Sequence, residues 1–349
     1  MVTEDAVLSA LRKVNDPELH RDLVSLGMVK EIKVDGGAVI VTVELTTPAC
    51  PMREQVEEEA KAAIKALPGV KEVTVNLTAN VRKPPAGRQP IPGIKHIVAI
   101  GSGKGGVGKS TVTANLAVAL AEAGAQVGLL DSDIYGPSIP LMMGVHRQPD
   151  VVNKRMIPPV SHGVKLMSLG FLLPDHTSPV VWRGPMVGQA VKQMLMEVDW
   201  GELDYLLADL PPGTGDASLT LAQTIPLSGA VVVMTPQEVA IQIATKTLNM
   251  FQTLRVPILG IIENMSYLSC PHCAQPVELF GHGGGRKASE RLEVPFLGEI
   301  PLDPALRRGG DVGRPILIEQ PDSPVAAVFR QVAANLAGRI SVEALAELS

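Results

Sequence analysis

From residue 94 onward, apolar residues gather in short unbroken runs that alternate with segments of helical periodicity. Unbroken runs of this length, rich in Val and Ile, are typical of strands buried on both faces of a parallel sheet. The alternation predicts an α/β fold with a doubly wound, mostly parallel sheet. The predicted strands are Ile94 to Ile100, Val127 to Asp131, Val164 to Leu169, Tyr205 to Asp209, Ala230 to Met234, Ile258 to Ile262 and Phe296 to Ile300.

The first 80 residues contain four predicted elements of their own. Asp5 to Val14 and Pro51 to Leu67 have helical spacing, and a Pro-Gly pair follows the second of these segments. Val39 to Leu45 and Val70 to Leu77 are rich in β-branched residues and predict strands. We therefore expect a small α+β domain over residues 1–80.

Two further segments complete the predicted organisation. Residues 81–93 are rich in proline and glycine, which indicates an extended linker. The remaining residues, 94–349, then form the doubly wound domain. Its last part, Ser323 to Leu348, alternates Ala, Val and Leu with polar residues and predicts a packed helix.

Composition narrows the class of protein. The chain has 349 residues, of which 46% are hydrophobic and 3% aromatic, so its core must be aliphatic. The net charge of −5 argues against a sequence-independent nucleic-acid binder, which needs a basic face. No apolar run reaches the roughly 20 residues of a membrane span, and the acidic N-terminus has no apolar signal core. We expect a cytoplasmic protein without nucleic-acid or membrane partners.

A glycine-rich segment with the Walker A pattern G-x-x-x-x-G-K-[ST] lies between the strand ending at Ile100 and an Ala- and Leu-rich helix closed by Gly124. Its glycines let backbone N–H groups turn inward around phosphate oxygens. Lys109 is expected to reach the β- and γ-phosphates, and the Ser110 hydroxyl to bind Mg²⁺. The sequence therefore predicts ATP and Mg²⁺ as ligands, bound by Gly103, Lys104, Gly105, Gly106, Val107, Gly108, Lys109, Ser110 and Thr111.

A second lysine, Lys104, directly follows the first glycine of this loop. It can lean over phosphates bound to its own chain or reach across a dimer interface. The arrangement resembles the deviant Walker A loop of the ParA, MinD and nitrogenase iron protein class, whose members sandwich nucleotide between two subunits. By that resemblance, Lys104 contacts the phosphates of the partner subunit and joins Lys109 in catalysis.

Three aspartates stand at the ends of predicted strands. Asp209 ends a hydrophobic strand in the Walker B form and is the expected carboxylate for Mg²⁺. At another strand end, Asp133 is the candidate for orienting the attacking water, and Asp131 for supporting the metal shell. Alone, each aspartate is equally typical of a turn or a helix N-cap. Their position beside a P-loop favours the catalytic interpretation.

Two further residues are nucleotide candidates. Gly213 lies in a Pro- and Gly-rich loop after Asp209, and its N–H is expected to sense the γ-phosphate as part of a switch. Asn264 lies at the end of a late strand, where its amide can both donate to and accept from the adenine edge. An asparagine that simply forms a turn is the alternative.

The cysteines suggest a metal site that one chain cannot complete. Cys270 and Cys273 form a C-x-x-C pair, and two thiolates at this spacing can share one metal ion or one cluster face. Tetrahedral zinc and a cubane cluster both require four ligands. Redox and purely structural roles remain as alternatives. Cys50, where a strand turns into a helix, is either a reactive or transient-ligand thiol or an inert half-buried one.

A C₂ homodimer would supply the missing ligands. An isologous interface brings the same loop of two subunits together and yields four cysteines around the axis. A [4Fe–4S] cluster or a Zn²⁺ ion is expected to sit there. A nucleotide sandwich is itself a dimer, so ATP hydrolysis is expected to open or close the cluster site.

These motifs together identify a family. The chain resembles the Mrp/ApbC family of iron–sulfur cluster carrier ATPases over nearly its whole length. The first 80 residues resemble the small domain fused ahead of many bacterial members, which is similar to SufT-type assembly factors. The matching segments are 103–110, 131–138, Trp182-Arg183-Gly184-Pro185, 209–216, Glu263-Asn264-Met265-Ser266, the Cys270/Cys273 pair, Asp16-Pro17-Glu18 and 46–51.

The resemblance implies a homodimeric carrier that binds a [4Fe–4S] cluster between Cys270 and Cys273 of two subunits. It would deliver the cluster to apo iron–sulfur client proteins, with assembly factors as further partners, using slow ATP hydrolysis. One alternative is a ParA/MinD-like spatial-organisation switch without a metal, but the acidic C-terminal tail disfavours binding to anionic lipid. A small-molecule ligase or phosphotransferase is another, although no motif marks an acceptor pocket.

Overall fold

The computed structural model describes residues 2–17, 19–81, 91–172, 184–270, 273 and 275–346. The chain divides into two compact units, one formed by residues 1–82 with 337–349 and the other by residues 83–336. Most of the predicted linker, residues 82–90, lies outside the described residues. The predicted limits of 1–80, 81–93 and 94–349 placed the last residues in the second domain, whereas this division groups them with the first.

The N-terminal unit is a small α+β fold. Its sheet has the order β3 (Val29–Asp35), β4 (Ala38–Leu45), β5 (Glu72–Ala79), with β3 antiparallel and β5 parallel to β4. The parallel pair requires a crossover, which α2 (Arg53–Lys65) provides. Burial alternates along β4, and its inward side chains share one core with α2 and with α1 (Glu4–Leu11). A short antiparallel pair, β1 (Asn15–Asp16) and β2 (Arg21–Asp22), completes the unit.

Strand β3 was not predicted. Four of the seven residues of its sequence, Val-Lys-Glu-Ile-Lys-Val-Asp, are charged, and its residues are exposed or half-buried. The hairpin to β4 turns at Gly36 and Gly37, both at positive φ, where glycine meets no penalty.

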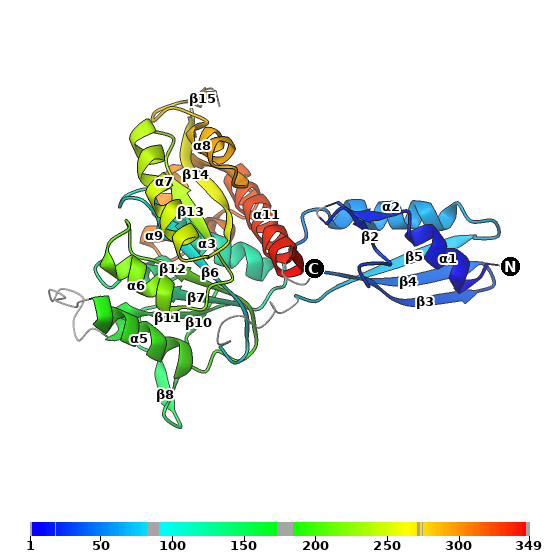
Figure 1. Ribbon diagram of the computed structural model, residues 1–349, viewed down its shortest axis with the longest axis horizontal. Helices are drawn as coiled ribbons and strands as arrows, with labels where there is room; N and C mark the ends of the chain where they lie inside the picture. The colour runs from blue at the N-terminus through cyan, green and yellow to red at the C-terminus, as the bar shows by residue number, and fades with distance from the viewer. Residues whose placement is uncertain are drawn as a thin grey trace. The chain divides into compact units, whose positions relative to one another are not determined.

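The second unit is the predicted doubly wound sheet (Figure 1). Its strand order is β10-β11-β7-β12-β6-β13-β14-β15, with β16 beside β14, and only the short β10 and β15 run antiparallel. All seven strands expected after residue 94 are present. Their bounds, with the two short strands, are β6 (Ile94–Ser102), β7 (Val127–Asp131), β10 (Val160–Ser161), β11 (Val164–Ser168), β12 (Leu203–Asp209), β13 (Gly229–Met234), β14 (Ile258–Ser269), β15 (Pro276–Val277) and β16 (Phe296–Leu302).

Helices flank this sheet (Figure 1). The one after the glycine-rich loop, α3, packs against β6, β7 and β12 and is buried over most of its length. The predicted last helix is confirmed as α11. The helices are α3 (Lys109–Glu122), α4 (Ile139–Met142), α5 (Gly184–Met196), α6 (Asp216–Thr224), α7 (Glu238–Thr253), α8 (Gly284–Leu292), α9 (Pro304–Asp311), α10 (Ile316–Glu319) and α11 (Pro324–Ala346).

The remaining small elements lie between β7 and α5 in the sequence. They are a hairpin of β8 (Asp150–Val152) and β9 (Arg155–Ile157), and a 3₁₀ turn over Leu169–Leu172. None of the described helices is both long and apolar enough to cross a bilayer.

Strand β14 is longer than predicted. The sequence placed its end at Ile262, but the strand continues to Ser269 and so contains Asn264. Met265 at φ +57 and a shift in the pairing with β16 mark an irregularity directly after Asn264. The strand therefore continues past Asn264 to the residue before Cys270.

Candidate functional site

The glycine-rich loop has the backbone of a phosphate cradle. Gly106 and Gly108 both have φ +79, a left-handed conformation that L side chains rarely adopt. Gly103 packs so closely on α7 that an added Cβ would lie 2.8 Å from the carbonyl carbon of Ile243. The loop ends at Gly108, the N-cap of α3, so the positive end of that helix faces the cradle.

Three donors converge on Asp209, the last residue of β12. Lys109 Nζ and Ser110 Oγ each lie 2.6 Å from its Oδ2, and Thr113 Oγ1 donates to its Oδ1 at 2.7 Å. Asp209 is fully buried, and Lys109 is only 6% exposed. The hydroxyl of Ser110 and the carboxylate of Asp209 are hard oxygen ligands on one spot, a set that fits Mg²⁺. The structure thus brings together the Walker A and Walker B residues that the sequence predicted.

Thr113 was not among the sequence candidates. It lies one helical turn after Lys109, on the same side of α3, and also donates to the backbone carbonyl of Lys109. That spacing is the only signal for it in the sequence. Ser132 was not among the sequence candidates either. Its hydroxyl donates to the backbone carbonyl of Asp209 at 2.7 Å.

Asp131 lies next to Asp209 on the neighbouring strand, β7, and is fully buried. Its carboxylate accepts hydrogen bonds from the Ser168 hydroxyl at 3.0 Å and from the backbone N–H of Asp133 at 3.2 Å. Burial, and then the nearby charge of Asp209, raise the pKa of Asp131 to about 7. Asp131 is therefore a carboxyl group that exchanges its proton near neutral pH.

Asp133 is half-buried just beyond the end of β7, where its carboxylate accepts from the backbone N–H of Gly136 at 3.3 Å. Burial raises its pKa, and the charge of Lys109 opposes the shift. A half-exposed carboxylate near Lys109 suits the predicted role of orienting a water molecule.

Lys104 contacts its own chain. Its Nζ donates to Gln237 Oε1 at 3.2 Å, and the same oxygen accepts from the Thr235 hydroxyl at 2.7 Å. Gln237 is the N-cap residue of α7, which packs against the glycine-rich loop. Any reach of Lys104 toward a partner subunit must replace this hydrogen bond.

The switch candidate Gly213 also contacts the loop region. It has φ +85, and its N–H donates to the backbone carbonyl of Ser102 at 2.7 Å. Its amide therefore lies beside the cradle. Sensing of a γ-phosphate by this N–H requires the bond to Ser102 to break.

Asn264 lies against the loop. Its amide nitrogen donates to the carbonyl oxygen of Val107 at 2.8 Å, and the side chain is 5% exposed. The same side chain occupies the space that a Cβ on Gly108 would need. One of the two N–H groups of the amide that the sequence suggested for adenine is therefore hydrogen-bonded to the backbone of the glycine-rich loop. Thr111 is half-buried on α3, with its hydroxyl 4.0 Å from Met142 Sδ.

The cysteine pair follows directly on β14. Cys270 is half-buried, with its backbone N–H bonded to Gln275 at 2.9 Å, and Cys273 is exposed. Both thiols are thus placed near the surface of the second unit. Residues 271, 272 and 274, as well as Trp182 and Arg183 of the family motif, lie outside the described residues. Cys50, in the N-terminal unit, is half-buried beside that unit's hydrophobic core.

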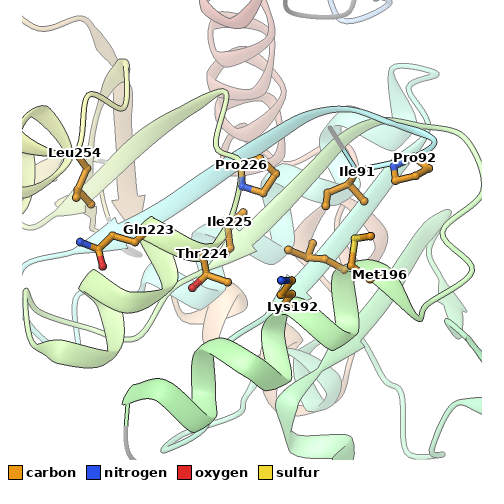
Figure 2. A pocket seen from close by; sticks show the side chains of 11 residues that line it. Ile91, Pro92, Lys192, Met196, Gln223, Thr224, Ile225, Pro226 and Leu254 are labelled. Carbon is orange, nitrogen blue, oxygen red and sulfur yellow. The ribbon is translucent and has the colours of Figure 1, made fainter. Parts of the chain in front are cut away.

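A separate cavity of about 700 Å³ opens between α5 and the end of α6 (Figure 2). Apolar side chains dominate its lining, together with Lys192, Gln223 and Thr224. None of the predicted nucleotide or metal residues lines it. The cavity is therefore distinct from the site formed by the glycine-rich loop.

Each of the two units matches a known protein family. A family described as NUBPL iron-transfer P-loop NTPase matches residues 93–337, and one described as iron-sulfur cluster assembly protein matches residues 4–77. An iron-sulfur cluster carrier protein of Synechocystis is 50% identical over 353 residues, covering 99% of this chain and 100% of the relative. One of Deinococcus radiodurans is 49% identical over 347 residues, covering 99% and 97%.

Solved structures agree with the fold. A nucleotide-binding protein of Archaeoglobus fulgidus in complex with ADP is 40% identical, with TM-score 0.60, covering 68% of this chain and 93% of that one. The cell division ATPase MinD of Pyrococcus furiosus is 25% identical, with TM-score 0.52, covering 69% and 97%. The predicted fold class is confirmed. By its match over residues 93–337 and its identity to carriers along its whole length, the chain belongs to the iron-transfer P-loop NTPase family of iron–sulfur cluster carrier proteins.

Proposed function

We propose that this protein is an ATP-hydrolysing carrier that binds a [4Fe–4S] cluster at a homodimer interface and transfers it to apo iron–sulfur proteins. The observation that carries the proposal is β14. This one strand touches the phosphate loop through Asn264 and ends directly before Cys270. A nucleotide site and a pair of thiols are thus attached to the same element.

The nucleotide chemistry follows from the donors around the loop. When ATP enters, its phosphates compete with Asp209 for Lys109, whose ammonium group then neutralises the β- and γ-phosphates. Ser110 and Asp209 would then hold Mg²⁺, which would neutralise charge that develops on the phosphates. Asp133 orients the water that attacks the γ-phosphorus, and the products are ADP and inorganic phosphate. Lys104 leaves Gln237 to contact the partner's phosphates.

The cluster is the cargo of the proposed carrier. Each iron of a [4Fe–4S] cubane takes one protein ligand, and thiolates are the usual choice. Cys270 and Cys273 supply two per chain, so two chains related by a two-fold axis supply the full set. The exposure of Cys273 is consistent with a cluster held at the protein surface, where a client can accept it.

Partners and location follow from the same proposal. The carrier meets its clients and assembly factors in the cytoplasm, and needs neither nucleic acid nor membrane. The rival interpretation as a MinD-like switch is not favoured, because 50% identity over the whole chain links it to carriers and 25% over its second unit links it to MinD.

The test is cluster reconstitution in Cys270→Ala/Cys273→Ala. Anaerobic incubation with iron and sulfide should load the wild-type protein with about two cluster irons and two sulfides per chain, as expected for one cubane per dimer. The double variant should take up no sulfide and form no cluster, while its ADP affinity stays unchanged because the thiols lie outside the nucleotide site. Cys50→Ala is the matched control and should load normally. Equal loading of the double variant would refute the bridging site.

A further inference from the structure

We propose a second metal site, for a divalent first-row transition metal ion, formed by Glu263, His282 and Glu299. One carboxylate oxygen of each glutamate and one ring nitrogen of the histidine lie within 4.8 Å of one another. These residues belong neither to the nucleotide site nor to the cysteine pair. The proposal therefore stands apart from the carrier function.

The sheet itself forces the two glutamates together. Glu263 on β14 and Glu299 on β16 are direct neighbours in the parallel register of these strands. Like charges at such positions repel each other and destabilise a sheet. The repulsion is strong here because Glu263 is fully buried, and a buried charge needs a compensating partner. A cation between the carboxylates would supply one.

The N-terminus of α8 faces Glu263 and offsets part of its charge, but no charged side chain in the described part of the chain does so. Among the described residues, no lysine or arginine forms an ion pair with Glu263 or Glu299, and the ionisable side chain that Glu299 contacts is His282. Two carboxylates and one imidazole leave a net charge of −2 when the imidazole is neutral and −1 when it is protonated. The cluster therefore retains negative charge that a divalent ion would neutralise.

The buried carboxylate is held in the manner of a metal ligand. Glu263 Oε1 accepts from the Ser266 hydroxyl at 2.6 Å and from the backbone N–H of Gly283 at 3.1 Å, and Oε2 accepts from the backbone N–H of Gly285. A carboxylate offers about four acceptor positions, so one remains on Oε2. Outer hydrogen bonds of this kind fix ligating carboxylates and are typical of metal sites.

The other two side chains leave a path for the ion. His282 Nε2 and Glu299 Oε2 are 3.1 Å apart, close to the separation of two ligands that each lie about 2.0–2.2 Å from one ion. Their side chains are 40% and 34% exposed, so the site opens to solvent and both can adjust. The ring of Tyr267 meets His282 edge-on at 6.2 Å between centroids and limits its orientation.

The donor set selects the ion. One imidazole nitrogen with two carboxylate oxygens suits Zn²⁺, Co²⁺ or Fe²⁺ and differs from the thiolates that bind clusters. Mg²⁺ and Ca²⁺ prefer oxygen ligands alone and are not the expected occupants.

The experiment uses Co²⁺ and Zn²⁺ with the tag-free full chain carrying Cys270→Ser/Cys273→Ser, so that the thiols cannot bind the metal. We expect one equivalent of Co²⁺ to give visible d–d absorption, and one equivalent of Zn²⁺ to bind in calorimetry. His282→Ala and Glu299→Gln, added singly, should each weaken binding at least tenfold. Both side chains are partly exposed, so circular dichroism should show an unchanged fold.

The matched controls are His146→Ala and Glu290→Gln, which remove an exposed histidine and an exposed glutamate elsewhere in the same unit. Both should bind metal as the parent does. The proposal is overturned if the parent binds no stoichiometric Co²⁺ or Zn²⁺, or if His282→Ala and Glu299→Gln bind as tightly as the two controls. Neither readout depends on ATP hydrolysis or on cluster loading.

Discussion

At the scale of single residues, the site is organised around the buried carboxylate of Asp209. Its charged partner is Lys109, at 2.6 Å. Because bound phosphates and Asp209 compete for the same ammonium group, Lys109→Ala should reduce ATP hydrolysis at least a hundredfold. It should leave cluster loading unchanged, since the thiols lie beyond the far end of β14. Phosphate release and iron content measure the two effects.

A suitable control for this variant is Lys246→Ala, which removes an exposed lysine from α7. It should hydrolyse ATP at the wild-type rate. Wild-type turnover by Lys109→Ala would remove this lysine from the mechanism.

Asp131 makes the stability of the second unit depend on pH. Its pKa is about 7 in the folded state, against an ordinary value of 3.8, so the folded protein binds this proton more tightly than the unfolded chain does. The contribution of Asp131 to stability therefore decreases as pH rises from about 4 to about 7, by at most ~4 kcal/mol. Asp131→Asn lacks this titration.

We expect the free energy of unfolding of Asp131→Asn, relative to wild type, to rise between pH 4 and pH 7 and to level off above pH 8. Urea unfolding at a series of pH values checks this, with fluorescence of Trp200, which is buried in the same unit, as the signal. A difference between the two proteins that does not change with pH would contradict the assignment.

At the scale of elements, the contact between the phosphate loop and α7 depends on Gly103. A Cβ there would lie 2.6 Å from Ile243 Cγ2 and 2.9 Å from the backbone nitrogen of Ala244. Because backbone cannot yield as a flexible side chain does, Gly103→Ala should cost about 1–3 kcal/mol of stability. The displaced loop should also lose most of the thermal stabilisation that Mg·ADP gives the wild type.

Gly105→Ala is the matched control in the same loop. A Cβ at this position meets only Pro212 Cγ, at 4.0 Å, and the residue has no positive φ. Its melting temperature without nucleotide should equal that of the wild type. Scanning calorimetry with and without Mg·ADP separates the two variants, and equal melting temperatures for both would show that close packing on α7 is unimportant.

The features that the sequence predicted are set by local patterns along the chain. Those that it missed depend on contacts between residues far apart in the sequence. The P-loop, the strand-end aspartates and the seven core strands follow from local patterns of glycine, charge and apolar runs, and all were predicted. Thr113 was missed because its bond to Asp209 joins residues 96 positions apart. The hydrogen bond from Asn264 to Val107 was missed for the same reason, since β14 must first pair within the sheet.

At the scale of the whole molecule, the remaining question is how many chains share one cluster. The two thiols of the C-x-x-C pair cannot satisfy the four irons of the proposed cluster, so loading should convert the 36.9 kDa chain into a species of about twice that mass. Native mass spectrometry should show this dimer carrying a single [4Fe–4S] cluster. Cys270→Ala/Cys273→Ala should stay at the mass of one chain under the same treatment.

Lys109→Ala separates dimerisation through the cluster from dimerisation through the nucleotide. Lys109→Ala keeps both thiols, so it should still form the loaded dimer although it no longer hydrolyses ATP. If dimerisation instead needs ATP, this variant stays monomeric even with iron and sulfide present, and the nucleotide sandwich must form before the cluster. A monomeric wild-type chain with a complete cluster would contradict both orders, because it would need ligands beyond Cys270 and Cys273.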